Sequence, residues 1–576
     1  MELLPFGNLP PYKARTFVPS DLALDNWMAI EPLFDRLEER IAACESVPDL
    51  EEWVLEVSEL SAILDEEGSR RYIAMTCHTS NEDAKKGYLD FVENIEPGMK
   101  ARFFRLSKLF VDHPKRGDLP KERYEVLDRD WASDVELFRE ENIPLETEET
   151  KLGQQYQEMM GALTVEFQGE EKTLVQMGVY LQENDRALRQ EAWELVTNKR
   201  LEVADKCDDQ FEKLLALREP IAANAGFENY REFKHISKGR FDYQPDDCFK
   251  FHEAVEQVVM PVHNELLVER REKMQLDALR PWDIGVDPLG RPPLKPFTEV
   301  DDMVARAKNI FDHVDGELAE GFQTMRDRNL LDLANRKGKA PGGYQSSLPE
   351  ARLPFIFMNA VGVDDNLRVL IHEGGHAFHS FAAADEPLVD YRHAPIEFCE
   401  VASMGMELLA IDHYTEFYEA DEAQRSKEDS LESIITVLAW IATIDCFQHW
   451  VYENPTHTPQ ERKVKWLEIH NKFGGQFTDW DNTGESHNYA WHRQLHLFEC
   501  PFYYIEYGIA QLGALGLWVQ AKADKTNALK NYHNGLSLGG SKRLPELFEA
   551  TGLPFDFSQK TIAPLAQALA DELELS

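Results

Sequence analysis

Two histidines four residues apart, with a glutamate directly after the first, form the most chemically informative pattern in this 576-residue chain. The three residues are His372, Glu373 and His376. On a helix, side chains four residues apart project from the same face, about one turn from each other. Both imidazoles can therefore reach one tetrahedral Zn²⁺, while Glu373 can act as general base on a water bound to the metal. The pattern predicts a catalytic site with one Zn²⁺ per chain.

The residues around this pattern predict the helix that must carry it. Asp364 and Asp365 are good N-cap residues, and apolar side chains follow them at helical spacing. Gly374 and Gly375 lie in the middle of this helix, where each costs about 1 kcal/mol relative to alanine. This cost indicates that another element or a substrate approaches the bare backbone closely at that point.

A catalytic zinc site also needs a third protein ligand and one open position. The metzincin solution, a histidine ten residues after His372, is excluded because that position holds Ala382. His379 lies one turn past His376, but three consecutive ligands on a straight helix would spread too widely, so we interpret it as a core or supporting residue. The acidic candidates downstream are Asp385, Glu386, Asp390, Glu397, Glu400 and Glu407.

Two of these candidates, Glu397 and Glu400, lie on a second predicted helix that begins after Pro395. A carboxylate on this antiparallel neighbour would complete a site of two histidines and one glutamate. The spacing alone does not choose between the two glutamates.

At this point the chain resembles the oligoendopeptidase F and thimet oligopeptidase family of zinc metallopeptidases. In that family the glutamate ligand follows the histidine helix by a little under thirty residues, in a Glu-Val-Ala/Pro-Ser context, and the segment that begins at Glu400 matches it. The resemblance implies that Glu400 is the third ligand and that Glu397 orients the site. Cys399 is then interpreted as a packed thiol rather than a rival ligand.

Further matches to this family precede the zinc helix. Residues 338–344 look like its glycine-rich active-site loop, and the residue order of a phosphate-binding loop is absent. Residues 355–359 predict a short strand, which the resemblance places at a sheet edge able to pair with an extended peptide. The predicted substrate contacts are Gly342, Gly343, Tyr344 and Asn359.

A last match, from His496 to Tyr507, is similar to the histidine and tyrosine segment of the family. Pro501 is suited to open a helix, on which Tyr504 and Tyr507 would share a face. Peptide hydrolysis builds negative charge on the carbonyl oxygen, and phenol or imidazole donors stabilise such a charge. The resemblance assigns this role to His496, Tyr504 and Tyr507. The alternative, from the residues alone, is an aromatic helix face in the core.

Composition and charge limit the possible partners. The formal net charge of −43 argues against nucleic acid or an anionic membrane, which would both be repelled. The first residues lack a basic start and an apolar run, so no signal peptide is predicted. The most apolar window, residues 434–444, is too short to span a bilayer and predicts a buried helix. Seven scattered cysteines fit reduced thiols, so a cytoplasmic location is predicted.

Helical periodicity dominates the rest of the chain. Residues 20–66 predict two amphipathic helices with Asp49 as a cap between them. A hairpin is predicted near residues 163–174, where Gly169 separates two strand-like runs. A short sheet is predicted for residues 342–359.

The predicted fold is mostly α, with a small β-sheet next to the zinc-binding helix. The resemblance implies two helical lobes around a deep substrate channel, with an N-terminal lobe over residues 1–190 and a catalytic lobe over residues 191–576. The predicted function is zinc-dependent hydrolysis of internal bonds in short unstructured peptides.

Two alternatives stay open. A dipeptidyl carboxypeptidase or other exopeptidase would use the same zinc chemistry, with an added cationic contact to the free carboxylate of the substrate. A peptide-binding scaffold that no longer cleaves would keep the fold without the reaction. The ligand types favour zinc but also permit Co²⁺ or Mn²⁺.

Overall fold

The structure, a computed structural model, describes residues 3–575. The prediction of no signal peptide concerns the first residues of the chain, and two of these, Met1 and Glu2, lie outside the described residues. The chain divides into two compact units, each assembled from separate segments. The first unit contains Met1–Glu136, Leu294–Lys427 and Ala510–Phe555, and the second contains Leu137–Pro293, Glu428–Ile509 and Asp556–Ser576. The predicted division into residues 1–190 and 191–576 stays a prediction.

Helices make up most of the first unit, which confirms the mostly α-helical class. Its helices are α1 (Trp27–Ala42), α2 (Val47–Cys77), α3 (Glu82–Asn94), α4 (Glu96–Val111), α12 (Val300–Val314), α13 (Gly316–Asp327), α14 (Asp364–Ala382), α15 (Ile396–Ala410), α20 (Lys525–Leu536) and α21 (Leu544–Ala550). Three of the five sequence boundaries between the units fall within α5 (Lys121–Leu137), α16 (Ala420–Glu453) and α19 (Tyr504–Ala523).

Helices α1 and α2 confirm the two helices predicted for residues 20–66, although α2 continues to Cys77. The N-cap of α2 is Ser46, whose side chain accepts a hydrogen bond from the backbone N–H of Asp49. In return, the Asp49 carboxylate accepts from the backbone N–H of Ser46 at 2.9 Å. Asp49 therefore takes part in the cap from within the helix, as half of a capping box. Apolar side chains such as Trp53 and Phe110 form the core that packs these helices together.

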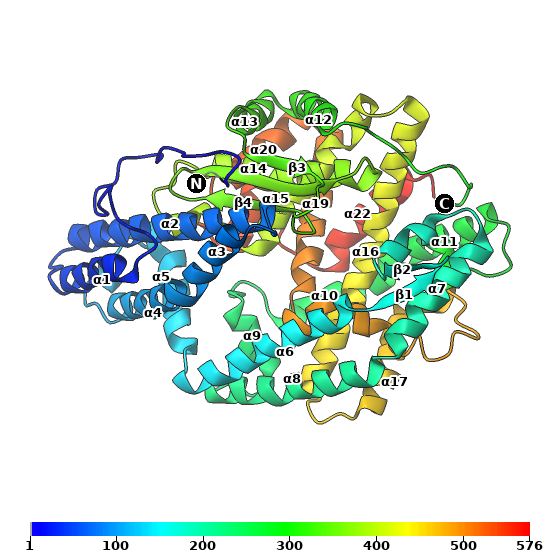
Figure 1. The fold of residues 1–576 in the computed structure, drawn as a ribbon, viewed down its shortest axis with the longest axis horizontal. Coiled ribbons are helices and arrows are strands. Elements are labelled where there is room, and N and C mark those ends of the chain that lie inside the picture. Colours follow the sequence, from blue (N-terminus) through cyan, green and yellow to red (C-terminus); the bar gives the residue numbers. More distant parts are fainter. Residues whose placement is uncertain (1–2, 576) are drawn as a thin grey trace. The chain divides into compact units, whose positions relative to one another are not determined.

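The small sheet predicted for residues 342–359 is present, and a further strand joins it. Its strands are β3 (Leu331–Ala334), β4 (Tyr344–Leu348) and β5 (Leu353–Ala360), in the order β3-β5-β4. The prediction that residues 355–359 form a sheet edge is wrong, because β5 pairs in parallel with β3 and antiparallel with β4. Within the described sheet, β4 is an edge strand, and it lies alongside α2 (Figure 1).

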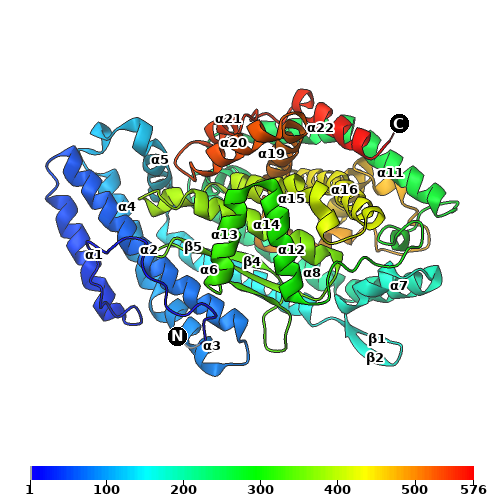
Figure 2. The same ribbon diagram turned by 90° about the horizontal axis from the view of Figure 1, so that it is seen from above.

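Helix α14 carries the histidine pattern and packs on β5, with α12 and α13 against it (Figure 2). Its start differs from the predicted one, because Asp364 and Asp365 lie in the first turn and Val363 is the N-cap residue. The side chain of Asn366 accepts hydrogen bonds from the backbone N–H groups of residues 361–363. Asn366 thus reaches back to the N-cap residue and the two residues before it, as the N3 side chain of a capping box does.

The second unit is also mainly helical, with one short hairpin in its described part. Its helices are α6 (Ile143–Gly161), α7 (Arg186–Leu201), α8 (Ala204–Asn224), α9 (Tyr230–Ser237), α10 (Pro245–Ala254), α11 (Met260–Lys273), α17 (Pro459–Lys472), α18 (Leu495–Glu499) and α22 (Gln559–Glu572). The predicted hairpin is confirmed, since β1 (Thr164–Phe167) pairs antiparallel with β2 (Glu170–Thr173) beside α7 (Figure 1). Gln168 and Gly169 form its two-residue turn with φ values of 55° and 80°.

The apolar window at residues 434–444 belongs to α16, a helix of 34 residues. Among the described residues, α16 is the one helix whose length and composition would suffice to cross a membrane. Of its most apolar 18-residue window, 61% is buried inside the protein. That burial is what a core helix shows.

Candidate metal centre

The two glycines of α14 lie where other elements approach its backbone most closely. A Cβ atom on Gly375 would lie 2.6 Å from the carbonyl oxygen of Ala402 and from Cα of Ser403, both on α15. A Cβ atom on Gly374 would lie 2.8 Å from the ring of Phe311. These contacts confirm the prediction that bare backbone is needed at this point. The close approach of α15 places its residues beside the histidine pair.

Three predicted ligands come together at this crossing. Donor atoms of His372, His376 and Glu400 all lie within 4.8 Å of one another. Glu400 Oε2 is 3.4 Å from His372 Nε2 and 3.8 Å from His376 Nε2. Ligands bound tetrahedrally to zinc at its usual bond lengths would lie about 3.3–3.5 Å apart. The donor types and separations therefore fit a single Zn²⁺.

Two further side chains of α15 hold these donors in place. Glu407 Oε1 lies 2.7 Å from His372 Nδ1, and this contact turns Nε2 of the same ring toward Glu400. Ser403 Oγ donates a hydrogen bond to Glu400 Oε2 at 3.0 Å. The sequence analysis counted Glu407 only among possible ligands. Its position seven residues after Glu400 is the signal that could have found it, because that spacing returns to the same helix face.

The remaining residues singled out near the ligands are also buried. His379 is 5% exposed and stacks edge-on against Phe398, and burial lowers its pKa to about 3. The thiol of Cys399 donates to the carbonyl oxygen of Ala394, which fits a packed thiol. Glu397 is 4% exposed at the start of α15, and its orienting role stays a prediction.

The electrostatics of the site favour a divalent cation. Burial opposes protonation of His372. The hydrogen bond and charge of Glu407, together with two further carboxylates nearby, nevertheless raise the pKa of His372 to about 9. Burial raises the pKa of Glu373 to about 7. Burial and the neighbouring histidines hold the pKa of His376 well below its ordinary value, so this imidazole is neutral. Carboxylates that attract a proton to His372 would also attract Zn²⁺, and neutral His376 can offer a lone pair.

A cavity of about 310 Å³ opens beside the three donors. Gly343 and Tyr344, two of the predicted substrate contacts, line it together with Gln345 of β4. The backbone N–H of Gln345 donates a hydrogen bond to the carboxylate of Glu373. The edge strand therefore positions the candidate base as well as one wall of the cavity.

The other two predicted substrate contacts, Gly342 and Asn359, are not among the described residues that line this cavity. Asn359 Nδ2 instead donates to the carbonyl oxygens of Ala340 and Gly342, at 2.7 and 2.9 Å. The amide thus ties the glycine-rich loop to β5. Gly342 adopts a φ of 92°, a conformation that side chains disfavour, and so it shapes the turn.

Comparison with known families decides the classification. Residues 179–566 match Peptidase family M3, and residues 20–138 match the Peptidase M3 N-terminal domain. The chain belongs to peptidase family M3. This result confirms the resemblance to the oligoendopeptidase F and thimet oligopeptidase family that the motifs indicated.

Individual M3 relatives agree with this classification. The chain is similar to oligopeptidase PepF of Bacillus subtilis (strain 168), with 23% identity over 51% of this chain and 44% of that protein. It is also 23% identical to the chromosomal oligoendopeptidase F of Lactococcus lactis subsp. cremoris, over 36% of this chain and 31% of that protein. The matched region thus spans less than half the length of these relatives. A solved structure of PZ peptidase A with inhibitor 2 superposes with a TM-score of 0.87, at 27% identity, covering 97% of this chain and 99% of that one.

In this M3 chain the predicted aromatic donors form a cluster in the second unit. The ring of His496 lies 4.8 Å from that of Tyr504 and 6.2 Å from that of Tyr507 between centroids. The two tyrosine rings are 5.7 Å apart. All three side chains are partly exposed, so they are not fully buried core residues. Gln494 Nε2 lies 2.8 Å from His496 Nδ1 and orients that ring.

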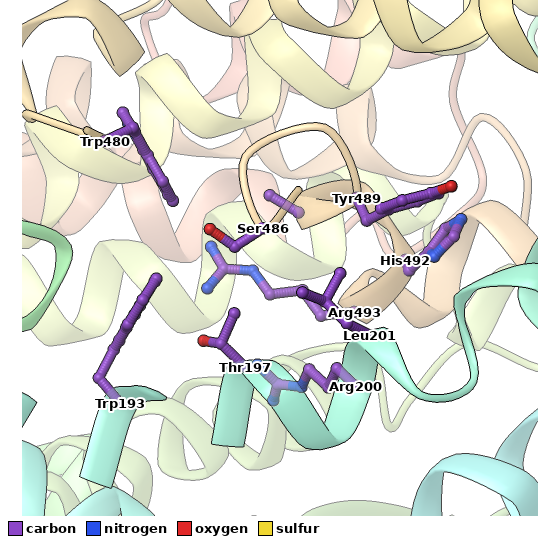
Figure 3. Close-up of a pocket in the computed structure, with 10 residues that line it drawn as sticks. Trp193, Thr197, Arg200, Leu201, Trp480, Ser486, Tyr489, His492 and Arg493 are labelled. Carbon is purple, nitrogen blue, oxygen red and sulfur yellow. The ribbon is translucent and has the colours of Figure 1, made fainter. Parts of the chain in front are cut away.

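A second pocket, within the second unit, combines aromatic and cationic groups (Figure 3). Arg200 comes from α7, whereas Arg493 comes from the segment that precedes α18. Burial lowers the pKa of both guanidinium groups, and the charge of Arg200 adds to the effect on Arg493. Arg200 Nε and Ser486 Oγ are buried without a hydrogen-bond partner among the described residues. The other lining residues are Trp193, Thr197, Leu201, Trp480, Tyr489, Ala490 and His492.

Proposed function

We propose that this family M3 member is a zinc-dependent oligoendopeptidase, which hydrolyses internal bonds of short unstructured peptides. The observation that carries the proposal is the convergence of His372, His376 and Glu400 beside Glu373, in a cavity lined by the glycine-rich loop. The names of the relatives, oligopeptidase and oligoendopeptidase F, support the substrate class. One Zn²⁺ at these three residues is part of this proposal.

The chemistry follows from the groups that surround the cavity. Zinc held by the three ligands would supply a Lewis acid that polarises a carbonyl and lowers the pKa of water. Glu373 takes a proton from the attacking water and passes it to the leaving amine, a role suited to a carboxylate whose pKa is raised to about 7. On the family resemblance, His496, Tyr504 and Tyr507 donate hydrogen bonds to the negative carbonyl oxygen.

Substitution of the proposed base tests this mechanism. Glu373→Gln keeps the shape of the side chain but removes its basicity, so we expect kcat/KM to fall by at least about 10³. Zinc content should stay at the level of the unaltered protein, because Glu373 is not a ligand. Turnover is measured by mass spectrometry of peptide products and zinc by atomic absorption. Asp365→Asn, at an exposed position in the same helix, is the matched control. Near-normal turnover in the Glu373 variant would contradict the mechanism.

The alternative is a dipeptidyl carboxypeptidase or other exopeptidase, which would use the same zinc chemistry with an added cationic contact to the free carboxylate of the substrate. Mapping the products of peptides of graded length, with free or amidated C-termini, separates the two functions. Chelator-sensitive internal cuts, insensitive to amidation, support the oligoendopeptidase. Serial loss of terminal dipeptides that amidation abolishes would favour the exopeptidase. No cleavage by zinc-loaded protein would favour the binding scaffold.

A further inference from the structure

Outside the centre on α14, a second group of metal-ligating side chains lies in the core of the second unit. Cys248 and His252 are four residues apart on α10, and Asp445 and His449 are four residues apart on α16. Each pair therefore projects from one face of its helix. The two pairs face each other, since His252 Nε2 lies 2.8 Å from Asp445 Oδ2 and the two imidazole rings are 5.8 Å apart.

These four side chains are removed from solvent. Their exposed fractions are 1% for Cys248, 5% for His252, 0% for Asp445 and 3% for His449. Apolar rings surround them, with Phe249 4.8 Å and Phe502 5.4 Å from the ring of His449. A carboxylate in such surroundings needs compensation of its charge, because burial of an unpaired ion costs several kcal/mol.

The donor atoms are spaced as a metal ion requires. Ligating atoms of Cys248, Asp445 and His449 all lie within 4.8 Å of one another, the same condition that the ligands on α14 and α15 meet. His449 Nε2 is 3.4 Å from Asp445 Oδ2. Neighbouring nitrogen and oxygen ligands of one tetrahedral zinc ion would lie about 3.3–3.5 Å apart.

Hydrogen bonding within the group does not satisfy all of its polar atoms. Both histidines approach the same carboxylate oxygen, Asp445 Oδ2. The other oxygen, Oδ1, and His449 Nδ1 are buried without a hydrogen-bond partner among the described residues. The two histidines share one oxygen beside a thiol, and the other oxygen has no hydrogen-bond partner within the described part of the chain. A closed hydrogen-bond network would leave no such atom, so a bound cation explains this arrangement better.

We propose that Cys248, Asp445 and His449 bind a second divalent metal ion in the interior of this unit, with His252 holding the Asp445 carboxylate in position. Thiolate, imidazole and carboxylate together select a borderline ion such as Zn²⁺ over Mg²⁺ or Ca²⁺. The charges also balance, because a divalent ion, a thiolate and a carboxylate sum to zero beside a neutral imidazole. A neutral assembly is what a buried site favours.

The role of this ion is structural. Its ligands come from α10 and α16, which are far apart in the sequence and which the ion would connect within one unit. Because the donors are buried, the ion would be acquired during folding and would leave only when the unit opens. The proposal is independent of the peptidase function.

Metal content of variants that lack the first centre tests the proposal. In His372→Ala/His376→Ala protein, refolded from denaturant in the presence of zinc and freed of excess by gel filtration, we expect one equivalent of zinc to remain. Adding Cys248→Ser to this background should remove it, whereas adding Cys207→Ser should not. Cys207 is the matched control because it is a buried free cysteine of the same unit. Less than a tenth of an equivalent in the double-histidine variant, with native circular dichroism, would overturn the proposal.

Cobalt substitution identifies the ligands directly. Co²⁺ bound to a thiolate gives a sulfur-to-metal charge-transfer band, which the centre of His372, His376 and Glu400 cannot produce. We expect this band in the double-histidine variant refolded with Co²⁺, and its loss on Cys248→Ser. Because serine keeps the size of the side chain, the triple variant should unfold in chelator at the same temperature as the double variant. Retained cobalt without the band would overturn the assignment of Cys248.

Discussion

Single side chains decide how well the candidate centre holds its ion. Glu407 contacts His372 and Ser403 contacts Glu400, two of the proposed ligands, and both contacting residues lie on α15. Each restricts its partner to one orientation, so the donors face a common point before an ion arrives. Their effect should therefore appear first in metal affinity.

Replacing Glu407 tests this effect. Glu407→Gln keeps a side chain of the same length but removes the charge that holds His372, so we expect zinc affinity to fall by about 10–100-fold. The dissociation constant is measured by competition with a chromophoric chelator. Glu422→Gln, at an exposed position in α16, is the control and should leave the affinity unchanged. An unaltered affinity in the Glu407 variant would show that the contact has no positioning effect.

A second residue-scale effect concerns the glycine-rich loop. Lys339 of this loop has a buried side chain, whose Nζ lies 3.0 Å from Asp332 Oδ1 on β3. Burial would raise the pKa of Asp332, but hydrogen bonds, that with Arg336 first among them, outweigh burial and lower it to about 2. A pKa below that of the unfolded chain adds stability that is present above about pH 4 and is lost as the pH falls toward 2.

Asp332→Asn should remove this contribution. We expect the variant to lose about 2 kcal/mol of unfolding free energy at pH 6, and the difference from the unaltered protein to shrink as the pH falls toward 3. Urea unfolding at the two pH values measures it. Asp302→Asn, which removes an exposed pairing with Arg306, should cost less than about 0.5 kcal/mol at either pH. An equal loss at both pH values for Asp332→Asn would contradict the charge argument.

At the scale of elements, the crossing of α14 and α15 determines where the donors of the candidate metal centre lie. The crossing is close because Gly375 has no side chain. The proposed third ligand, Glu400, and the residues that contact the proposed ligands, Ser403 and Glu407, all lie on α15. Anything that separates the two helices should disturb stability and metal binding together.

Gly375→Ala is the sharpest test of this dependence. Its Cβ would meet backbone atoms of α15 at 2.6 Å, so we expect a loss of about 1–3 kcal/mol and weaker zinc binding. Gly87→Ala in α3 is the matched control, since no atom lies within 4 Å of its Cβ position. Alanine is a better helix former, so the control should gain up to about 1 kcal/mol. Thermal unfolding and zinc competition measure both variants, and a stable Gly375→Ala protein with normal affinity would contradict the argument.

At the scale of the whole molecule, charge is the dominant property. The 104 acidic side chains outnumber the 61 basic ones by 43, and this excess repels itself in the compact state. The same excess underlies the predictions of no nucleic-acid or membrane partner. A cytoplasmic location also stays a prediction from composition.

Self-repulsion of this size predicts a salt-dependent melting temperature. Raising NaCl from 0.1 to 1 M shortens the screening length from about 10 to about 3 Å, so we expect the temperature to rise by a few degrees. Differential scanning fluorimetry at pH 7.5 measures it. The rise should shrink near pH 5, where fewer carboxylates are charged. A melting temperature that falls with salt would show that attractive ion pairs outweigh the net repulsion.

The amino-acid sequence by itself determined the parts of the site that depend on local spacing. The helical repeat places His372 and His376 on one face whatever surrounds them, and Glu373 follows from the same pattern. The demand for bare backbone at Gly374 and Gly375 was also visible, because glycine in a helix is costly. The helical class and the hairpin around Gly169 followed from periodicity and turn chemistry.

Only the tertiary structure decided which distant elements meet. Spacing left Glu397 and Glu400 open as third ligand, and the packing of α15 on Gly375 places Glu400 Oε2 between the two imidazoles. The position of β5 within the sheet was decided in the same way. It is the central strand because β3 and β4 pair with its two edges. Contacts of this kind depend on residues far apart in the chain, whose pairing no local repeat specifies.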